Sequence, residues 1–520
     1  MANVIAALTE LLAVPNVPAA DAEAAILLCE QLLARLRHCQ PPPPSERVSI
    51  STLPTELLTR VIACLEPEDI SRVLCAGRLF CGQEAPPPPP PPRSVVEEAL
   101  RQRAAASGRA VAASLSPGDI SWVQKLLWDE RRALFDRPAP VGCGRWHTAF
   151  VDASGHLLTT GNGFGDSEPP GPARLGHGPA TWELFEPTTI TSFPASVCIE
   201  RVSAGSVHTL AVDSLGRAYS FGLGQWGQLG HGVFHDEGTP RHIASFESVR
   251  VCAAAAGGLC SLFLGDDGTA WSCGQSRMNG LLSLSEDPLR KQHRATPKAL
   301  DELPRLVAVS AAEDHALLLS EHGAVYSFGR GPCIGHGVAC DIYQATPRRI
   351  EALAHARFVA ISAGDATSVL LCHDGTVYAF GRLFWLSSDS VDAFVELRLP
   401  TGIPQRDASI RAVAAGGNHA LLLSDSGQVF SVGSGRYGQL GHADENDEQT
   451  PREIAALRGV HICAVAAGSR SSVALAADGS VYGWGQAMDE DGEQVPTLGL
   501  PVTEDDVLMP MRYDGLVARV

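Results

Sequence analysis

The sequence has few basic residues for its size, and this scarcity limits what it can bind. Its 520 residues include 40 Lys and Arg against 58 Asp and Glu, a formal net charge of −18. A broad nucleic-acid surface needs basic side chains that displace counterions from phosphates, so the composition makes nucleic acid an unlikely partner. The acidity is uneven: residues 1–140 carry 14 basic and 16 acidic side chains, and the remainder carries 26 and 42.

Long apolar runs and paired cysteines are also missing. No stretch approaches the roughly 18 consecutive apolar residues of a membrane helix, and the N-terminus has no basic segment leading into an apolar core. We therefore expect no membrane span and no secretory signal. The 14 Cys are scattered without a C-x-x-C pair or zinc-like spacing. This pattern indicates reduced thiols and a cytoplasmic or nuclear location.

Catalytic and cofactor motifs are absent as well. There is no Gly-rich phosphate loop ending in Gly-Lys-Ser/Thr and no metalloprotease helix, and no Cys lies in a motif that would make it a ubiquitin-accepting nucleophile. Acidic clusters at 444–448, 489–493 and 504–506 could bind a metal or a basic partner, but we interpret them as solvated loops between strands. We expect a protein that is not an enzyme and that holds no cofactor or metal.

Proline-rich segments at 41–44 and 85–93 divide the N-terminal region. Because polyproline extends at about 3.1 Å per residue, we interpret the second segment as a semi-rigid spacer. The alternative is docking on a proline-binding groove. Apolar spacing predicts helices in 1–40 and in a connector over 94–140. From 141 to 520 the pattern changes to short apolar strands punctuated by Gly, which places the main domain boundary before Val141.

A repeat of about 52 residues runs through 141–520, at intervals of 61, 52, 55, 52, 52 and 52 residues. In one unit, apolar residues alternate before Gly216 (Leu210, Val212) and after it (Tyr219, Phe221), which is typical of a β-hairpin. We expect the turn glycine to have a positive φ. The turn glycines are Gly155, Gly216, Gly268, Gly323, Gly375, Gly427 and Gly479. Six residues after them lie Gly161, Gly222, Gly274, Gly329, Gly381, Gly433 and Gly485.

Hairpins of this kind must bury their apolar faces against neighbours, and a radial arrangement of seven gives a β-propeller. The units resemble the repeats of the regulator of chromosome condensation family, most clearly at 221–231 and 433–442, and the resemblance covers about 141–520. It implies a mainly β fold with seven blades. The tail at 516–520 resembles the strand that enters other units. We therefore expect it to pair beside the first blade and to close the ring.

Two sets of histidines recur in the repeat, and we interpret neither as a metal site. The first set lies eight residues before the turn glycine, in different units, and three units have Cys260, Thr367 or Ser471 there instead. We expect these side chains to bond to neighbouring backbone, and we treat the second set likewise. The first set is His147, His208, His315 and His419, and the second is His177, His231, His336 and His442.

The block at 50–83 has an apolar stripe at helical spacing but too few residues for a core of its own, so it needs a partner. It resembles an F-box, whose pattern begins Leu-Pro-x-Glu-Leu-Leu, although Phe80 stands where that family often has Trp. The alternative is a helical hairpin packed on the propeller. The resemblance implies docking on the adaptor of a cullin–RING ubiquitin ligase through Leu53, Pro54, Leu57, Leu58, Ile62, Leu65, Ile70 and Val73.

Together the two resemblances predict a substrate-recognition subunit, in which the F-box docks the adaptor and the propeller loops bind a target protein. Two alternatives stay open: a guanine-nucleotide exchange factor for a small GTPase, an activity of some relatives of the propeller, and a general interaction scaffold. Exchange requires a wedge, but no repeat exceeds 52 residues by more than nine. A photoreceptor like the plant ultraviolet receptor is rejected, because only Arg145 and Trp146 fit its clustered Trp and Arg residues.

Overall fold

The computed structural model describes residues 101, 140–163, 174–178, 180–275, 293–337, 343–382, 394–399, 409–488, 494–500 and 506–520. The chain divides into two compact units, Met1–Leu134 and Phe135–Val520. The first unit contributes only Arg101 to the described residues, so the F-box-like block and the proline-rich segments lie outside them. Among the residues described, no helix combines the length and the apolar character that crossing a membrane requires.

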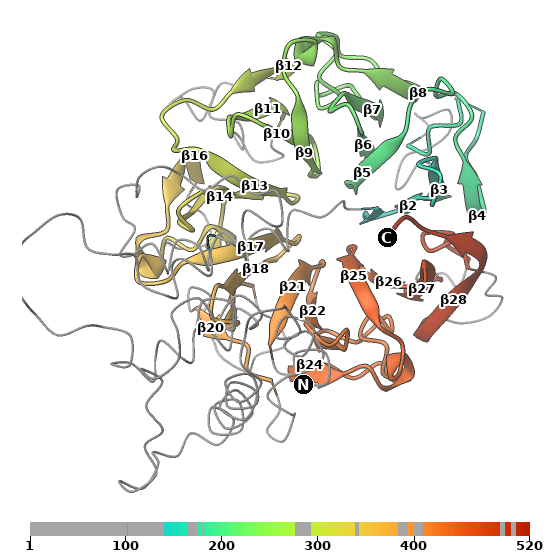
Figure 1. The fold of residues 1–520 in the computed structure, drawn as a ribbon, viewed down its shortest axis with the longest axis vertical. Coiled ribbons are helices and arrows are strands. Elements are labelled where there is room, and N and C mark those ends of the chain that lie inside the picture. Colours follow the sequence, from blue (N-terminus) through green and yellow to red (C-terminus); the bar gives the residue numbers. More distant parts are fainter. Residues whose placement is uncertain are drawn as a thin grey trace, which may run out of the picture. The chain divides into compact units, whose positions relative to one another are not determined.

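Seven four-stranded antiparallel sheets make up the second unit and surround a central axis (Figure 1). Each sheet, or blade, takes its four strands consecutively from the chain. The predicted mainly β fold with seven blades is therefore confirmed. In each blade the first strand lies nearest the axis and the fourth lies at the rim.

The strands of the first four blades are β1 (Val141–Cys143), β2 (His147–Val151), β3 (Leu157–Asn162) and β4 (Glu183–Thr189); β5 (Ile199–Ala204), β6 (His208–Asp213), β7 (Ala218–Gly222) and β8 (Glu237–His242); β9 (Val251–Ala256), β10 (Cys260–Gly265), β11 (Ala270–Gly274) and β12 (Arg294–Ala299); and β13 (Leu306–Ala311), β14 (His315–Ser320), β15 (Val325–Arg330) and β16 (Tyr343–Arg349).

The strands of blades 5 to 7 are β17 (Phe358–Ala363), β18 (Thr367–Cys372), β19 (Val377–Gly381) and β20 (Val395–Glu396); β21 (Ile410–Ala415), β22 (His419–Ser424), β23 (Val429–Gly433) and β24 (Glu448–Glu453); and β25 (Ile462–Ala467), β26 (Ser471–Ala476), β27 (Ser480–Gly485) and β28 (Val507–Val517). Four 3-10 helices lie in the connections: η3 (Ala244–Phe246), η4 (Pro332–Ile334), η5 (Glu351–Leu353) and η6 (Ala455–Leu457).

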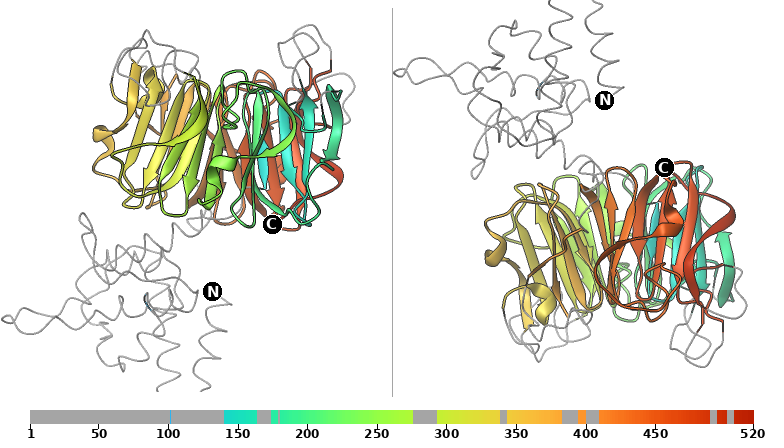
Figure 2. Two further views of the ribbon diagram at one scale, coloured as in Figure 1. Left: turned by 90° about the horizontal axis from the view of Figure 1, so that it is seen from above. Right: turned by 90° about the horizontal axis from the view of Figure 1, so that it is seen from below.

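The strands run between two faces of the ring, which Figure 2 shows side on. We call one of them the loop face: it carries the turns between the first and second strands and the connections between the third and fourth strands. The opposite face carries the turns between the second and third strands and the connections to the next blade. The residues of each face come from fixed positions of the repeat. The position of a residue in the repeat therefore shows on which face it lies.

The predicted hairpin of the second unit is β6 and β7, in which Leu210 pairs with Ser220 and Val212 with Ala218. The turn is held by Asp213, whose Oδ1 accepts hydrogen bonds from the backbone N–H groups of Leu215 (3.0 Å) and Arg217 (2.8 Å). The turn glycines have the predicted positive φ, a backbone conformation that is unfavourable for residues with a Cβ atom. The values are 83° for Gly155, 79° for Gly216, 83° for Gly268, 78° for Gly323, 91° for Gly375, 85° for Gly427 and 86° for Gly479.

The second glycine of each pair is the last or the next-to-last residue of the third strand, which there passes close to the backbone of the second strand. At Gly222 a Cβ atom would lie 2.7 Å from the carbonyl oxygen of Val207, closer than any side chain tolerates. The third strand therefore sets the six-residue spacing. The first glycine is required by the turn before this strand, and the second is required by the close backbone approach at its end.

The hydrophobic core lies between neighbouring blades. Leu210 and Val212 of β6 pack in one cluster with Phe263 of β10, and Phe246 lies with its ring centroid 5.0 Å from that of Phe263. A further cluster joins blades 6, 7 and 1, with Leu421 and Trp484 among its buried members. Because every blade buries both faces in this way, the first and last blades must also meet.

The C-terminal tail closes the ring by completing the first strand of blade 1. β1 has three residues, whereas the first strands of the other blades have six. Ala518 forms a β-bridge with Asp152, and the Ala153 N–H donates to the carbonyl of Val517 (3.1 Å). In blade 6 the equivalent positions of the first strand are occupied by Ile410 and Ser409. The tail therefore supplies the part of the first strand that blade 1 lacks. The predicted closure is confirmed.

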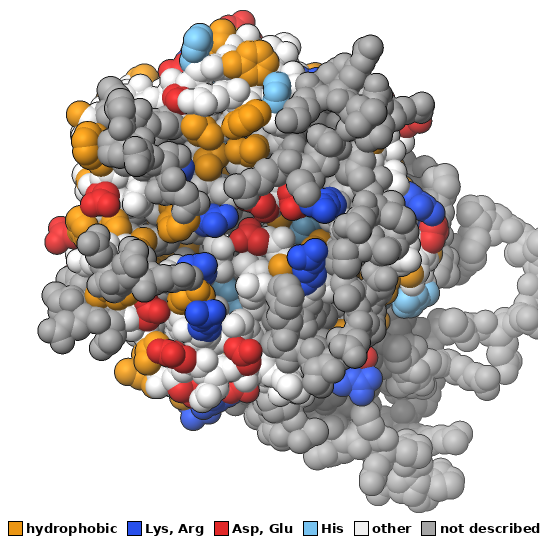
Figure 3. Space-filling view, turned by 180° about the vertical axis from the view of Figure 1, so that it is seen from behind, with side chains coloured by type: hydrophobic (Ala, Val, Ile, Leu, Met, Phe, Trp, Pro, Cys, Tyr) orange, Lys and Arg blue, Asp and Glu red, His pale blue; other side chains and the backbone are white. Residues whose placement is uncertain are grey.

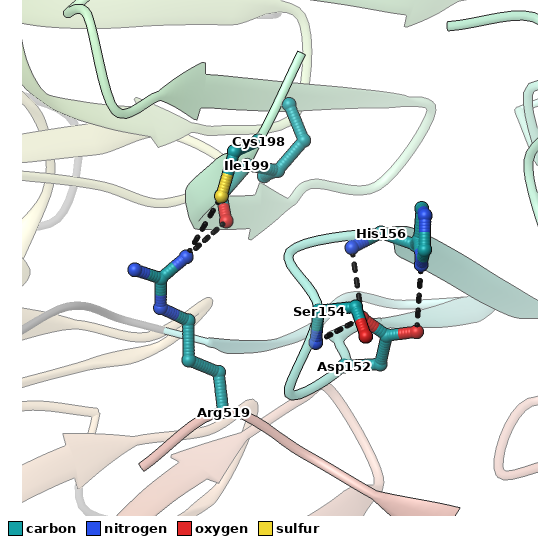
Figure 4. A network of polar contacts seen from close by, with 6 residues as sticks. All are labelled: Asp152, Ser154, His156, Cys198, Ile199 and Arg519. Carbon is teal, nitrogen blue, oxygen red and sulfur yellow. Dashed lines mark hydrogen bonds and ion pairs between the residues drawn. The ribbon is translucent and has the colours of Figure 1, made fainter. Parts of the chain in front are cut away.

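Arg519 extends this closure to blade 2 (Figure 4). Its Nη1 lies 3.0 Å from Cys198 Sγ and 3.4 Å from the carbonyl oxygen of Ile199. Its backbone N–H donates to the carbonyl of Val151 (2.9 Å). The last residues of the chain thus join blades 7, 1 and 2.

We predict that deleting residues 517–520 destabilises the propeller. The deletion removes the pairing of Val517 with Ser480 and three backbone hydrogen bonds outside the sheet ladders, which involve Val517, Ala518 and Arg519. At about 0.5–1.5 kcal/mol each, their loss lowers the free energy of unfolding by about 2–4 kcal/mol. Urea denaturation of the full chain measures the change, and Val520→Ala, at an exposed side chain, is the control. An unchanged unfolding midpoint in the deletion variant would contradict this role for the tail.

Candidate protein-binding face

The first histidine set joins neighbouring blades. Nε2 of His208 in β6 lies 2.7 Å from Ser261 Oγ in β10, and that hydroxyl donates to the carbonyl of Gln228 (2.7 Å). Since the hydroxyl has one proton to donate, Nε2 of His208 is the protonated nitrogen. The same contact joins His147 to Thr209 (2.7 Å), His315 to Ser368 (2.8 Å) and His419 to Ser472 (2.8 Å).

This partner corrects the sequence expectation, which placed the bonds on neighbouring backbone. The hydroxyl comes from the residue that follows the histidine position in the next blade, some fifty residues later in the chain. Burial lowers the pKa of His147, His208 and His315 to about 3 and that of His419 to about 4. These histidines are therefore uncharged structural links between blades near neutral pH.

The second histidine set bonds within its own blade. Each Nε2 contacts a hydroxyl of the third strand, as in His231 with Ser220 (2.9 Å), and burial lowers the pKa of each ring. The other pairs are His177 with Thr159, His336 with Ser327, and His442 with Ser431. Within the described part of the chain, no group of His, Cys, Asp and Glu has an arrangement that could hold a metal ion.

Five cysteine thiols of the propeller are poorly placed for nucleophilic chemistry. Burial raises the pKa of Cys333 and Cys372 to about 11, and it also raises the pKa of Cys143, Cys260 and Cys273. A thiol with a raised pKa holds its proton near neutral pH, whereas the thiolate is the nucleophile. These five groups serve as small core residues.

Charged and polar side chains meet at the axis on the loop face. They come from one position of the repeat, two residues before the first histidine position. Five of them line a cavity of about 60 Å³ to which all seven blades contribute. We call them the axial cluster: Arg145, Ser206, Glu313, Asp365 and Ser469.

Two hydrogen bonds cross the axial cluster between distant blades. Ser206 Oγ of blade 2 donates to Glu313 Oε2 of blade 4 (2.7 Å), and Ser469 Oγ of blade 7 donates to Asp365 Oδ2 of blade 5 (2.7 Å). Burial raises the pKa of Asp365, an effect that the Ser469 hydrogen bond opposes. The cluster thus fills the end of the axis with a polar centre.

Aromatic rings lie together further out, on the loop-face connections of blades 2 and 3. The ring of His293 lies 5.0 Å from that of Trp226 and 6.2 Å from that of Phe234, between centroids. Phe234 is 48% exposed, and Trp226 and His293 are half-buried. We call these three residues the aromatic sector. Figure 3 shows the face seen from behind, where apolar side chains gather near histidines and charged ones lie nearer the centre.

Arginines stack on aromatic rings elsewhere on this face. Arg436 of blade 6 and Arg470 of blade 7 both lie over Tyr437, at 5.6 and 4.4 Å from its centroid. Arg145 lies over Trp146 at 5.2 Å, and it is the one Arg–Trp stack among the described residues. We call Arg436, Tyr437 and Arg470 the basic sector. The loop face therefore presents an aromatic sector and a basic sector around an axial cluster that contains Glu313 and Asp365.

The sequence analysis predicted two groups of site residues, and neither lies in the axial cluster or the two sectors. The adaptor-binding residues of the F-box-like block lie outside the described residues. The seven turn glycines lie on the opposite face, away from the axial cluster. The axial cluster and the two sectors were not singled out from the sequence. The sequence does contain a signal for them: when the repeat units are aligned, these residues differ from unit to unit while the residues around them repeat.

Comparisons with known proteins bear on the same region. The sequence model of the RCC1-like domain matches residues 171–519. The Ultraviolet-B receptor UVR8 of Arabidopsis thaliana is 30% identical over 342 residues, which cover 62% of this chain and 74% of that protein. The Regulator of chromosome condensation of Homo sapiens is 27% identical over 362 residues, which cover 65% and 82%.

One further relative is much longer than this chain. The E3 ubiquitin-protein ligase HERC2 of Homo sapiens is 32% identical over 351 residues, 65% of this chain but only 7% of that protein. Among solved structures, Prp20p of Saccharomyces cerevisiae is 24% identical with a TM-score of 0.56 and covers 75% of this chain and 89% of its own. A likeness at this level of identity supports the fold.

We predict that the buried histidines make stability depend on pH. Their folded-state pKa lies below the ordinary 6.5, so the unfolded chain binds more protons in acid. The stability they contribute is fully present above about pH 6.5 and is lost as the pH falls toward 3. At about pH 5, one such histidine lowers the free energy of unfolding by about 2 kcal/mol relative to neutral pH.

Urea denaturation of the wild type and of His208→Gln at neutral pH and at about pH 5 tests this. Glutamine retains an N–H donor for Ser261 but does not titrate, so the variant should lose less stability on acidification. His235→Gln, at an exposed histidine, is the matched control and should behave as the wild type. Equal acid sensitivity of the wild type and His208→Gln would contradict the assignment.

Proposed function

The chain belongs to the RCC1-like domain family, and from this premise we propose that it is the non-enzymatic substrate-recognition subunit of a cullin–RING ubiquitin ligase. The F-box-like block at 50–83 docks the ligase adaptor, and the loop face of the propeller binds a target protein. The observation that carries the proposal is the loop face, which gathers aromatic side chains and arginines. Such residues are enriched in protein interfaces and in their energetic hot spots.

The chemistry of the described residues supports a binding role over an enzymatic one. The recurring histidines are bonded to hydroxyl groups and uncharged near neutral pH, and the five buried thiols hold their protons. In a ligase, the reactive groups lie on other subunits, and the receptor contributes proximity by holding the target near them. A cytoplasmic or nuclear site of action goes with this assignment.

The ubiquitin assignment draws on two further observations. Residues 53–58 read Leu-Pro-Thr-Glu-Leu-Leu, the opening of the F-box pattern. A relative that contains a domain of this kind, HERC2, is itself named a ubiquitin-protein ligase. Since the chain spans 7% of that protein, the likeness concerns the propeller and not the ligase activity. The F-box-like block gives this chain a different route to the same process.

Guanine-nucleotide exchange on a small GTPase is the second candidate. It is favoured by the X-linked retinitis pigmentosa GTPase regulator homolog of Caenorhabditis elegans, 26% identical over 365 residues that cover 67% of this chain and 23% of that protein. Release of labelled GDP from a panel of small GTPases discriminates between the two functions. Accelerated release would favour exchange, and unchanged release across the panel would favour the receptor.

We predict that Leu57→Asp combined with Ile62→Asp abolishes co-purification of the cullin adaptor with the tagged full chain. The two charges interrupt an apolar stripe that the F-box resemblance assigns to the adaptor contact. Thr59→Asp, on the polar side of the same predicted helix, is the matched control and should retain the adaptor. Full recovery of the adaptor with the double variant would eliminate the F-box assignment, provided that the variant keeps the wild-type melting temperature.

We predict that Trp226→Ser combined with Phe234→Ser weakens capture of the target. Truncating an aromatic anchor of an interface costs about 2 kcal/mol or more, so capture should fall by at least about ten-fold. Proximity labelling with the tagged full chain compares this variant with the wild type. Leu215→Ser, at a 62% exposed residue of the opposite face, is the control. Identical labelling by the wild type and both variants would argue against the loop face as the binding surface.

A further inference from the structure

The basic sector has the chemistry of an anion clamp. We propose that the guanidinium groups of Arg436 and Arg470 together bind one anionic side chain, a carboxylate or a phosphoryl group, of a partner protein. This inference deepens the proposed function and rests on the loop face being a protein-binding face. It names the chemistry of the residue that the partner must present.

The two arginines come from different blades and lie against the same ring. Arg436 lies in the connection after β23, and Arg470 lies in the turn before β26. Both contact Tyr437, with the Arg470 guanidinium carbon 4.4 Å and the Arg436 carbon 5.6 Å from its ring centroid. A guanidinium that stacks on a ring uses its flat face, so the N–H groups along its edge remain oriented for hydrogen bonding to an anion.

Three carboxylates of blade 6 close to this sector are engaged by other groups. Arg452 pairs with Glu448 (2.7 Å) and with Asp444 (3.6 Å), and Asp447 accepts a hydrogen bond from the Gly435 N–H (2.9 Å). Within the described part of the chain, neither arginine of the basic sector forms an ion pair. The polar contact of Arg470 is a 3.5 Å bond from its Nη1 to the neutral amide oxygen of Gln486. Two like charges are thus held over one ring, an arrangement that an added anion would stabilise.

Blade 2 has a connection equivalent to that of the basic sector but without the arginines, so the two blades can be compared. Blade 2 carries the same connection, and the backbone N–H groups of Gly224 and Trp226 make the same bonds, to Asp236 and Gln228, as those of Gly435 and Tyr437 make to Asp447 and Gln439. There Gln225 replaces Arg436, Trp226 replaces Tyr437 and Leu259 replaces Arg470.

Gln225 donates to Asp236 Oδ2 (3.2 Å), whereas Arg436 lies against the ring of Tyr437. The connection therefore keeps the same backbone hydrogen bonds with neutral residues at both arginine positions. Since folding does not require these arginines, their side chains are available for recognition.

Charge selects a protein over a nucleic acid as the source of the anion. The region from 141 to 520 carries 26 basic and 42 acidic residues, and Glu313 and Asp365 of the axial cluster lie on the same face. A polyphosphate chain crossing this face would meet those carboxylates, because it presents a charge at every nucleotide. A single carboxylate or phosphoryl group can contact the two arginines without approaching those carboxylates. Arginine binds carboxylates and phosphoryl groups alike in a bidentate geometry.

Fluorescence anisotropy with the purified full chain tests the clamp. The probes are a labelled oligoglutamate peptide, a peptide of equal length carrying one phosphoserine, and an oligoglutamine peptide. We expect the wild type to bind at least one anionic peptide in preference to oligoglutamine. Arg436→Gln with Arg470→Gln should weaken that binding by about ten-fold or more, because the variant loses the charge-assisted hydrogen bonds to the anion. The tighter of the two anionic peptides identifies the source of the anion.

Arg458→Gln is the matched control, because it removes one positive charge from the opposite face of blade 6, where Arg458 pairs with Glu453 (2.7 Å). It should leave anionic-peptide binding unchanged. Equal binding of the anionic peptides by the wild type and the double variant would overturn the proposal. So would the absence of anionic-peptide binding to the wild type, or tighter binding of oligodeoxythymidine than of either peptide.

The anion clamp and the proposed function can be disproved independently of each other. If the peptides do not discriminate but Trp226→Ser with Phe234→Ser still abolishes target capture, the clamp is wrong and the binding face stands. If the clamp holds while the adaptor is retained by Leu57→Asp with Ile62→Asp, the F-box assignment is wrong and the clamp stands. The melting temperature of the double arginine variant should match the wild type, because blade 2 shows that the connection folds without arginine.

Discussion

Burial of both faces of every blade is the constraint on which this structure depends. A four-stranded sheet with an exposed apolar face is not stable in water, so each blade needs a neighbour on both sides and the row of blades must become a ring. The ring has one seam, and the chain closes it with a strand made of two pieces, β1 and the tail that contains Ala518. Stability of the whole propeller therefore depends on residues 377 positions apart in the chain, Val141 and Ala518.

The same constraint explains which residues repeat and which do not. The turn glycines and the second glycines recur in all seven blades because every hairpin meets the same demand. The histidine–hydroxyl pairs, which join a blade to the next one, recur in four blades. The residue that faces the axis meets no such demand: it is Arg145 in one blade, Glu313 in another and Gly258 in a third. Function can vary at such positions while the framework stays the same.

Much of the fold could be predicted from the sequence because its causes are local. The positive φ at Gly216 follows from a short turn, and the seven hairpins follow from alternation on either side of it. The closure was predicted because residues 516–520 resemble a strand seen elsewhere in the chain. The partner of His208 was predicted wrongly, as backbone, because Ser261 belongs to another blade and only the tertiary packing brings the two together.

The proposed binding face could not be predicted for the same reason, since its groups come from connections that are far apart in sequence. Arg436 and Arg470 become neighbours only because blades 6 and 7 lie side by side, and the contact becomes a candidate clamp only by comparison with Gln225 and Leu259. Burial lowers the pKa of the interblade histidines, so these links between blades carry no charge near neutral pH. Substitutions in the loops then change what the face binds at little cost to the ring, and one fold can carry aromatic and basic sectors on different blades.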